Sequence, residues 1–147
     1  MKNKWMFFLY ISIFLYSCGG SNKQESVETM QNNQIATTEF LKGKQIYELR
    51  CANCHKKNGN GMGGLYPPIS GSDYLVGHFD EVVCLIKKGS NAPLVVNGKE
   101  YKMPMPPHSD LSKVEISDLM NYIMNAWSNK LGPVTTRKVS NALKKCN

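Results

Sequence analysis

Residues 51–55 read CANCH and bring two cysteines, Cys51 and Cys54, next to a histidine, His55. Such a cluster can hold a structural metal, carry out dithiol redox chemistry or attach a cofactor covalently. A structural zinc site usually takes four ligands from two close pairs, but Cys84 and Cys146 stand singly. A thioredoxin-like dithiol lies where a strand enters a helix, whereas this pair follows a helical pattern. The interpretation that remains is covalent attachment of a c-type haem, for which C-x-x-C-H is the signature.

With His55 on one face, a low-spin haem iron needs a second axial ligand on the other face. Residues 101–107 read YKMPMPP and place Met103 and Met105 among three prolines. Because proline fixes φ and has no N–H to donate, this segment is expected to be a stiff extended loop. A thioether is a soft ligand, and Met/His ligation raises the haem potential. The alternative is that both methionines fill the core, but beside CANCH the ligand interpretation is favoured.

The pattern of apolar residues predicts an all-α domain of three to four helices with long loops. In the first helix, Phe40, Gly43 and Tyr47 share one face with both cysteines of CANCH. Another helix is expected to begin at a capping box formed by Ser112 and Glu115. The remaining expected elements are a helix over 79–88, a hairpin turn over 95–98 and a last helix over 136–145. Loops this long around a small core indicate that something large occupies its centre.

The N-terminus is typical of an export signal. Two lysines precede an apolar stretch from Trp5 to Tyr16, which as a helix is only about 18 Å long and too short for a ~30 Å hydrocarbon core. It ends in LYSC, which resembles the bacterial lipoprotein cleavage box. We therefore expect a signal peptide over 1–17, removed before Cys18, which then carries lipid. The alternative is an ordinary signal peptide with a chance cysteine.

The predicted domain organisation follows from this leader. Residues 18–37 are polar and are expected to form a flexible tether, and residues 38–147 form one folded domain. Lipid anchoring would place this domain in the periplasm or on another face of the cell envelope. The net charge of +7 allows an anionic partner, but an exported protein does not meet the chromosome. Nucleic acid is therefore excluded as a partner.

The chain resembles the class I c-type cytochromes, small monohaem proteins common among bacterial exported proteins. The resemblance covers roughly residues 40–126, which is nearly the whole predicted domain. It is carried by CANCH and by the segments NGNG, PPISG, YKMPMPP and LSKVEISDLMNYI, in that order. It implies the cytochrome c-like fold, one covalent haem c and single-electron transfer between redox proteins.

The resemblance also implies a role for each residue of the site. Cys51 and Cys54 would form thioethers with the haem, and His55 would be the proximal iron ligand. Pro67, in PPISG, matches the proline whose carbonyl accepts the other N–H of the ligand imidazole, a contact that tunes its basicity. Met105 matches the distal methionine better than Met103, because it stands six residues before Leu111 and the start of the following helix.

The remaining candidate residues have other interpretations. His78 and His108 lack the family positions and are expected to be surface residues. In an oxidising compartment Cys84 and Cys146 either form a disulfide or remain two free thiols. Eight lysines flank the segments around the predicted site and either form a docking rim for an acidic redox partner or a merely soluble surface: Lys42, Lys44, Lys56, Lys57, Lys87, Lys88, Lys99 and Lys102.

The sequence therefore predicts a lipid-anchored, exported electron carrier that is not an enzyme and has no small-molecule substrate. Gly43 is expected to let the first helix cross the helix that begins at Ser112 closely, beside Tyr122. Two other functions stay open. One is a haem sensor or enzyme whose sixth ligand is displaced by a small molecule, and the other is a cytochrome subunit of a larger oxidase or reductase.

Overall fold

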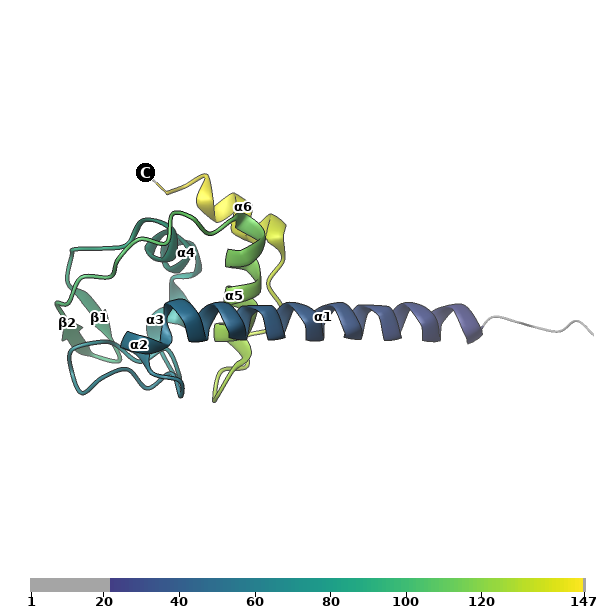
Figure 1. Ribbon diagram of the computed structural model, residues 1–147, viewed down its shortest axis with the longest axis horizontal. Coiled ribbons are helices and arrows are strands. Elements are labelled where there is room, and N and C mark those ends of the chain that lie inside the picture. The colour runs from purple at the N-terminus through teal and green to yellow at the C-terminus, as the bar shows by residue number, and fades with distance from the viewer. Residues whose placement is uncertain (1–21, 147) are drawn as a thin grey trace, which may run out of the picture.

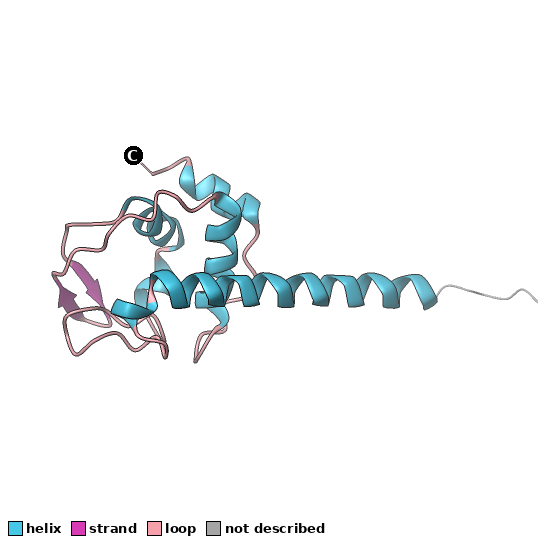
Figure 2. Ribbon diagram, viewed as in Figure 1, coloured by secondary structure: helices cyan, strands magenta, loops and turns pink. Residues whose placement is uncertain are grey.

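The computed structural model describes residues 22–146 (Figure 1). The predicted signal peptide 1–17 and the lipidation site Cys18 lie outside the described residues. Within them the chain is mainly helical, and long loops connect the helices around the site (Figure 2). The predicted fold class, an all-α cytochrome c-like arrangement with long loops, is confirmed; the one described sheet is a two-stranded hairpin.

Two helices cross closely at the centre of the fold. Helix α1 spans Asn22–Arg50 and packs against α5, Lys113–Asn125. A Cβ atom at Gly43 would overlap the backbone carbonyl of Asp118 and crowd Tyr122. Only glycine allows this approach, which confirms the predicted crossing. The rings of Tyr47 and Tyr122 pack beside it with their centroids 5.4 Å apart.

Helix α1 begins at Asn22 rather than at Thr38 as the sequence predicted. The expectation of a flexible coil is therefore wrong for residues 22–37, although the boundary of the folded domain at residue 38 stays a prediction. No glycine or proline occurs between residues 22 and 42. Because helix propagation adds one hydrogen bond for each residue fixed, a helix nucleated by packing on α5 continues outward through such a sequence. Figure 1 shows this part of α1 extending away from the other helices.

The other elements largely follow the sequence prediction. The structure contains α2 over Ala52–His55, α3 over Asp73–Gly77, α4 over Phe79–Lys88, β1 over Leu94–Val96, β2 over Lys99–Tyr101 and α6 over Thr136–Leu143. Helix α3 was not predicted; it is a single short turn capped by the side chain of Ser72. The hairpin turns at Asn97 and Gly98, whose φ values of 52° and 72° suit a tight turn.

Helix α5 lies at the centre of the core, where α1, α4 and α6 pack against it. The predicted capping box is present: Ser112 Oγ accepts the Glu115 N–H at 3.3 Å, and Glu115 Oε2 accepts the Ser112 N–H at 2.8 Å. The helix then buries side chains on nearly every side, among them Ile116, Leu119 and Met120. No described helix is both long and apolar enough to cross a membrane.

A disulfide joins α4 to the end of the chain. It links Cys84 in α4 to Cys146, just beyond α6, with the two Cα atoms 5.4 Å apart. Of the two states that the sequence left open for these cysteines, the structure contains the bonded one. Because α4 packs mainly against α6, the bond reinforces an existing helix pair.

Candidate functional site

One helical turn gathers the residues of CANCH. The Cys51 N–H donates to the Tyr47 carbonyl at 2.9 Å, which carries the helical path from α1 into α2. The His55 N–H then donates to the Cys51 carbonyl at 2.9 Å. Lys56 ends the turn in a left-handed conformation with φ of 63°, and its carbonyl accepts from the buried Tyr47 hydroxyl at 2.7 Å.

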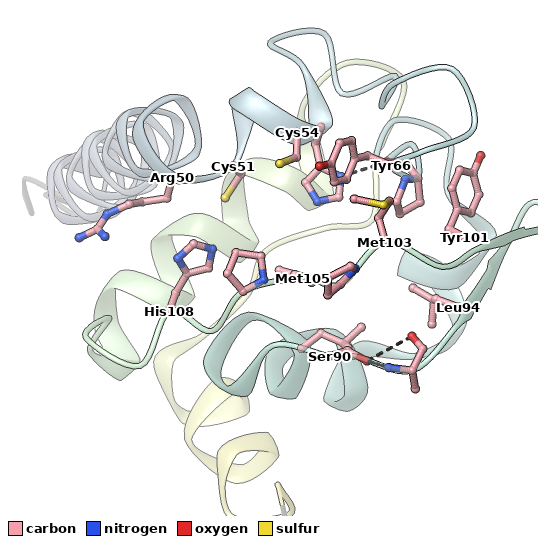
Figure 3. Close-up of a pocket in the computed structure, with 16 residues that line it drawn as sticks. Arg50, Cys51, Cys54, Tyr66, Ser90, Leu94, Tyr101, Met103, Met105 and His108 are labelled. Atoms are coloured by element: carbon pink, nitrogen blue, oxygen red, sulfur yellow. Dashed lines mark hydrogen bonds between the residues drawn. The ribbon is translucent and has the colours of Figure 1, made fainter.

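This turn forms one wall of a mostly apolar hollow in the domain (Figure 3). An open cavity is lined by Cys51, Cys54 and His55 on one side and by Met103 and Met105 on the other. A second cavity continues inward to Leu119 and Ile123 of α5. The two share six lining residues, which are Cys51, His55, Pro67, Leu85, Leu94 and Met105. Together they provide the concave, largely apolar space expected of a cofactor site.

The imidazole of His55 is fixed and neutral. Its Nδ1 lies 2.9 Å from the Pro67 carbonyl oxygen, which can only accept, so Nδ1 carries the proton. Burial is the main influence on this ring and lowers its pKa; the Pro67 hydrogen bond opposes the shift and nearby His108 adds to it. A neutral imidazole with Nδ1–H engaged leaves Nε2 free to bind a metal.

The Pro67 loop reaches His55 because glycines let the backbones approach. The Gly59 carbonyl accepts from the N–H groups of Ile69 and Ser70, at 2.7 and 2.9 Å. Gly61 has φ of 69°, and a Cβ atom there would overlap the Tyr66 carbonyl and the Pro67 backbone. The glycine-rich NGNG segment therefore allows the hydrogen bond between His55 and Pro67.

On the opposite wall, Met105 is held by a backbone bridge to Ser90. The Met105 N–H donates to the Ser90 carbonyl at 2.8 Å, and the Ser90 N–H donates back to the Met105 carbonyl at 2.9 Å. The neighbouring Gly89 has φ of 71°, and a Cβ atom there would overlap the Met105 carbonyl. Met105 is half-buried and packs against the core, whereas Met103 is 45% exposed on the cavity rim. These positions favour Met105 over Met103 as an inward-facing ligand, which stays a prediction.

The two rival histidines differ from each other. His78 is exposed, as predicted, and its ring stacks on Tyr74 with the centroids 4.3 Å apart. The surface prediction is wrong for His108, which is half-buried and lines the cavity beside Arg50 (Figure 3). The reason is that the backbone N–H of His108 donates to the Ile86 carbonyl of α4 at 3.0 Å, which holds the loop against α4. Burial and Arg50 lower the pKa of His108.

The two thiols of CANCH lie in a partly buried setting and, within the described residues, have no cluster of further metal ligands beside them. Burial, with a contribution from Cys54, raises the pKa of the Cys51 thiol to about 12, so this thiol is protonated at neutral pH. Among residues 22–146 no group of three or more histidine, cysteine and acidic side chains could hold a metal ion. A zinc site therefore has no support in the described part of the chain.

Comparison with known proteins agrees with this geometry. The profile of the cytochrome c family matches residues 40–127, which include both walls of the cavity. The chain belongs to the cytochrome c family. Members of this family carry covalently attached haem c, and the cavity fits such a group: two thiols and a free imidazole nitrogen lie on one wall, a thioether on the other, and apolar side chains between them.

The relatives include a small cytochrome and subunits of larger enzymes. The cytochrome c-552 of Thermus thermophilus is 32% identical over 89 residues, which are 58% of this chain and 67% of the relative. The cytochrome c subunit of the quinone-dependent alcohol dehydrogenase of Gluconacetobacter polyoxogenes is 32% identical over 74% of this chain and 24% of the relative. The gluconate 2-dehydrogenase cytochrome c subunit of Pantoea cypripedii is 26% identical over 92% of this chain and 32% of the relative. The chain thus spans only about a quarter to a third of the length of these dehydrogenase subunits.

Sequence reasoning missed the polar groups that support the two walls. Ser90 has no recognisable signal, because it acts through its backbone. Asn121, Asn125 and Asn129 do leave one: they recur at intervals of four in and just after α5. Their side chains bind backbone groups of neighbouring segments, and Asn129 binds the loop that follows Pro67. An asparagine stripe beside an apolar helix face could have indicated such clamping.

Proposed function

We propose that this protein is an electron carrier that uses one covalently attached haem c. The observation that carries the proposal is the convergence of Cys51, Cys54, His55 and Met105 on one apolar cavity. When bound, the haem supplies a one-electron Fe(III)/Fe(II) couple. The protein's part is to hold the group, to choose its ligands and to keep water away.

Each residue then has a definite task. Cys51 and Cys54 would hold the group through thioether bonds, and Nε2 of His55 would bind its iron. The Pro67 carbonyl orients the imidazole and raises its basicity. Met105 is the second ligand, held by the Ser90 bridge. Because the Pro67 hydrogen bond holds the His55 ring in place, a change of iron charge would require little rearrangement on this side of the site.

We further propose that the protein acts outside the cytoplasm, on redox proteins as partners. The export signal at residues 1–17 and the lipid on Cys18 would anchor it to a membrane face in the periplasm or cell envelope. Two of the eight lysines that could form a docking rim are engaged with neighbouring groups of the domain. Lys87 Nζ donates to the carbonyls of Ser109 and Leu111, both at 2.7 Å, and Lys102 pairs with Glu100 at 3.0 Å. These two ammonium groups therefore support local structure.

A second candidate function is that of a cytochrome subunit within a larger dehydrogenase. It is favoured by the relatives whose names describe them as subunits of alcohol and gluconate dehydrogenases. Gentle extraction of membranes that contain the tagged full-length protein distinguishes the two. A stable stoichiometric complex with a dehydrogenase supports the subunit, and a monomeric cytochrome that exchanges electrons with added partners supports the carrier.

The haem proposal is tested directly on protein matured in a host that attaches c-type haem. The haem is expected to stay with the protein after extraction with acidified acetone. The oxidised protein is expected to show the weak charge-transfer absorption of methionine–iron ligation, which Met105→Ala removes and the matched variant Met103→Ala retains. Loss of the band in Met103→Ala but not in Met105→Ala would mean that Met103 is the ligand. Absence of the band in the unaltered protein would favour a haem with an open sixth position.

A further inference from the structure

Asn129 is a buried side chain whose hydrogen-bonding capacity is used on two sides. It lies just past the end of α5 and is 6% exposed. Its Nδ2 donates to the Ile69 carbonyl at 3.0 Å and to the Ile123 carbonyl at 2.7 Å, and its Oδ1 accepts the Gly71 N–H at 2.8 Å. The side chain therefore ties the segment 69–71 to the last turn of α5.

This segment follows directly after Pro67 and Pro68, so its placement controls the direction of the Pro67 carbonyl. The ring of Pro68 fixes its own φ and confines Pro67 to an extended conformation. Few soft torsions remain between the Pro67 carbonyl and the Ile69 amide. Once Ile69 is held by Asn129 on one side and by Gly59 on the other, the Pro67 carbonyl has little freedom to turn away from His55.

We propose that Asn129 is a positioning residue for the proximal ligand and sets the reduction potential through the Pro67 carbonyl. The inference rests on the proposed function, in which His55 binds the iron. A firm hydrogen bond from Nδ1–H to Pro67 makes the imidazole more electron-donating, which favours the oxidised iron. Loosening the loop weakens this bond, and the potential then shifts to a more positive value.

The chain supplies a matched control in Asn121. It is 7% exposed and lies within α5, and it holds a different segment by the same chemistry. Its Nδ2 donates to the Val134 carbonyl at 2.7 Å, and its Oδ1 accepts the Val134 N–H at 2.7 Å. Loss of either amide leaves buried backbone groups unpaired, so both variants lose stability. Of these two asparagines, only Asn129 binds the loop that carries Pro67.

The experiment compares the full-length holoproteins Asn129→Ala and Asn121→Ala with the unaltered protein. Two quantities are measured: the reduction potential, by spectroelectrochemical titration, and the solvent exchange of the His55 Nδ1 proton, by NMR. In Asn129→Ala the potential is expected to rise, and the proton to exchange roughly tenfold faster, the equivalent of about one hydrogen bond. In Asn121→Ala both are expected to stay at the values of the unaltered protein.

Equal shifts in the two variants, or no shift in Asn129→Ala, would overturn the inference. If Asn129→Ala does not fold, Asn129→Ser replaces it, with Asn121→Ser as its control. It removes the amide that binds Ile69 and adds no charge, so a rise in potential is again expected, and its absence counts against the proposal. Failure of the proposed function is seen separately, in the unaltered protein. Haem that is extractable, or iron whose resonance spectrum lacks a histidine ligand, refutes the function before any variant is compared.

Discussion

The two walls of the cavity are attached to different parts of the fold. Three side-chain hydrogen bonds tie the His55 wall to α1 and to the residues at and after the end of α5. The Tyr47 hydroxyl of α1 donates to the Lys56 carbonyl at 2.7 Å. Beyond α5, Trp127 Nε1 donates to the Lys57 carbonyl and Asn129 Nδ2 to the Ile69 carbonyl, both at 3.0 Å. The Met105 wall is hydrogen-bonded instead to α4 and to Ser90 just after it. Ser90 bonds Met105 itself, and Ile86 and Lys87 of α4 bond the backbone of the residues that follow Met105.

This difference has a mechanical consequence. Helices α1 and α5 form the closely crossed centre of the domain, so the His55 wall moves only if the fold is disrupted. Helix α4 packs mainly against α6 and is bonded to the chain end at Cys146. We therefore expect the Met105 loop to shift more easily than the His55 wall. Substitutions in the His55 wall should therefore lower the free energy of unfolding, whereas substitutions in the Met105 wall should weaken the binding of Met105 to the iron.

The largest loss of stability is expected from removing the disulfide with Cys84→Ser and Cys146→Ser together. The two cysteines are 62 residues apart in sequence, and a loop of that size gives about 4 kcal/mol in the chain-entropy model. The loss is measured by chemical denaturation of the holoprotein. Because the bond anchors α4, the methionine charge-transfer band should also weaken below the unfolding transition. A variant that loses stability with an unchanged band would show that α4 holds Met105 without the bond.

The next effect is expected at Gly61, on the His55 wall. Gly61→Ala places a Cβ atom against the Tyr66 and Pro67 backbones at a φ of 69°. The strain and the overlap together should cost about 3 kcal/mol, because this loop is too firmly tied to move aside. The measurements are the yield of holoprotein and its denaturation midpoint.

Gly63→Ala is the matched control for Gly61. Gly63 also has a positive φ, of 49°, but no atom lies within 4 Å of the added Cβ. The Gly63→Ala variant should therefore lose only the free energy of the backbone strain, about 1 kcal/mol. Equal losses in the two variants would mean that the close approach of the Pro67 loop is unimportant.

Gly89 tests the Met105 wall in the same way. Gly89→Ala places a Cβ atom against the Met105 carbonyl at a φ of 71°. Among the described residues Met105 is hydrogen-bonded only to Ser90, so its loop is expected to yield, and the stability loss should be nearer 2 kcal/mol. The expected signature is loss of the methionine band with the haem still attached.

The control for Gly89 is Gly98→Ala in the hairpin turn. Its φ of 72° is nearly the same, and nothing lies within 4 Å of the added Cβ. This variant should keep the methionine band. If Gly89→Ala keeps the band and loses as much stability as Gly61→Ala, the two walls are equally rigid and the comparison fails.

The sequence predicted what depends on local pattern. CANCH, the capping box at Ser112 and the turn at Asn97 each carry their signal within a few residues, and the structure contains the corresponding turn, cap and hairpin. The close crossing at Gly43 was also predictable, because a glycine inside an apolar helical stripe has no other local reason to be there.

The sequence could not predict what depends on pairing between distant segments. The bridge from Ser90 to Met105 uses backbone atoms alone, and the inward position of His108 follows from a hydrogen bond to Ile86 that no pattern encodes. The error at residues 22–37 has a different cause. Polar composition was taken as a sign of coil, but composition does not prevent a helix from continuing when it is nucleated elsewhere and meets no glycine or proline.

The smallest effect is expected at the start of α5, which belongs to neither wall and serves as a reference. The Ser112 backbone N–H, followed by the Ser112 side chain, lowers the pKa of the Glu115 carboxyl. A carboxyl whose pKa is lower in the folded state adds stability that is complete above its unfolded pKa. That stability is lost as the pH falls through the lowered value. The free energy of unfolding should therefore decline below about pH 4.5, the ordinary pKa of this carboxyl.

Ser112→Ala removes the hydroxyl but keeps the backbone N–H, so it should flatten this acid decline only in part. It should cost about 1 kcal/mol at neutral pH, the usual value of an N-cap. Denaturation curves collected between pH 3 and pH 7 measure both effects, with Ser109→Ala, an exposed serine just before the helix, as the control. Because the capping box contacts neither His55 nor Met105, the reduction potential and the methionine band should stay unchanged. A shift in either would mean that α5 transmits strain to both walls alike, and that their different attachments do not separate stability from ligation.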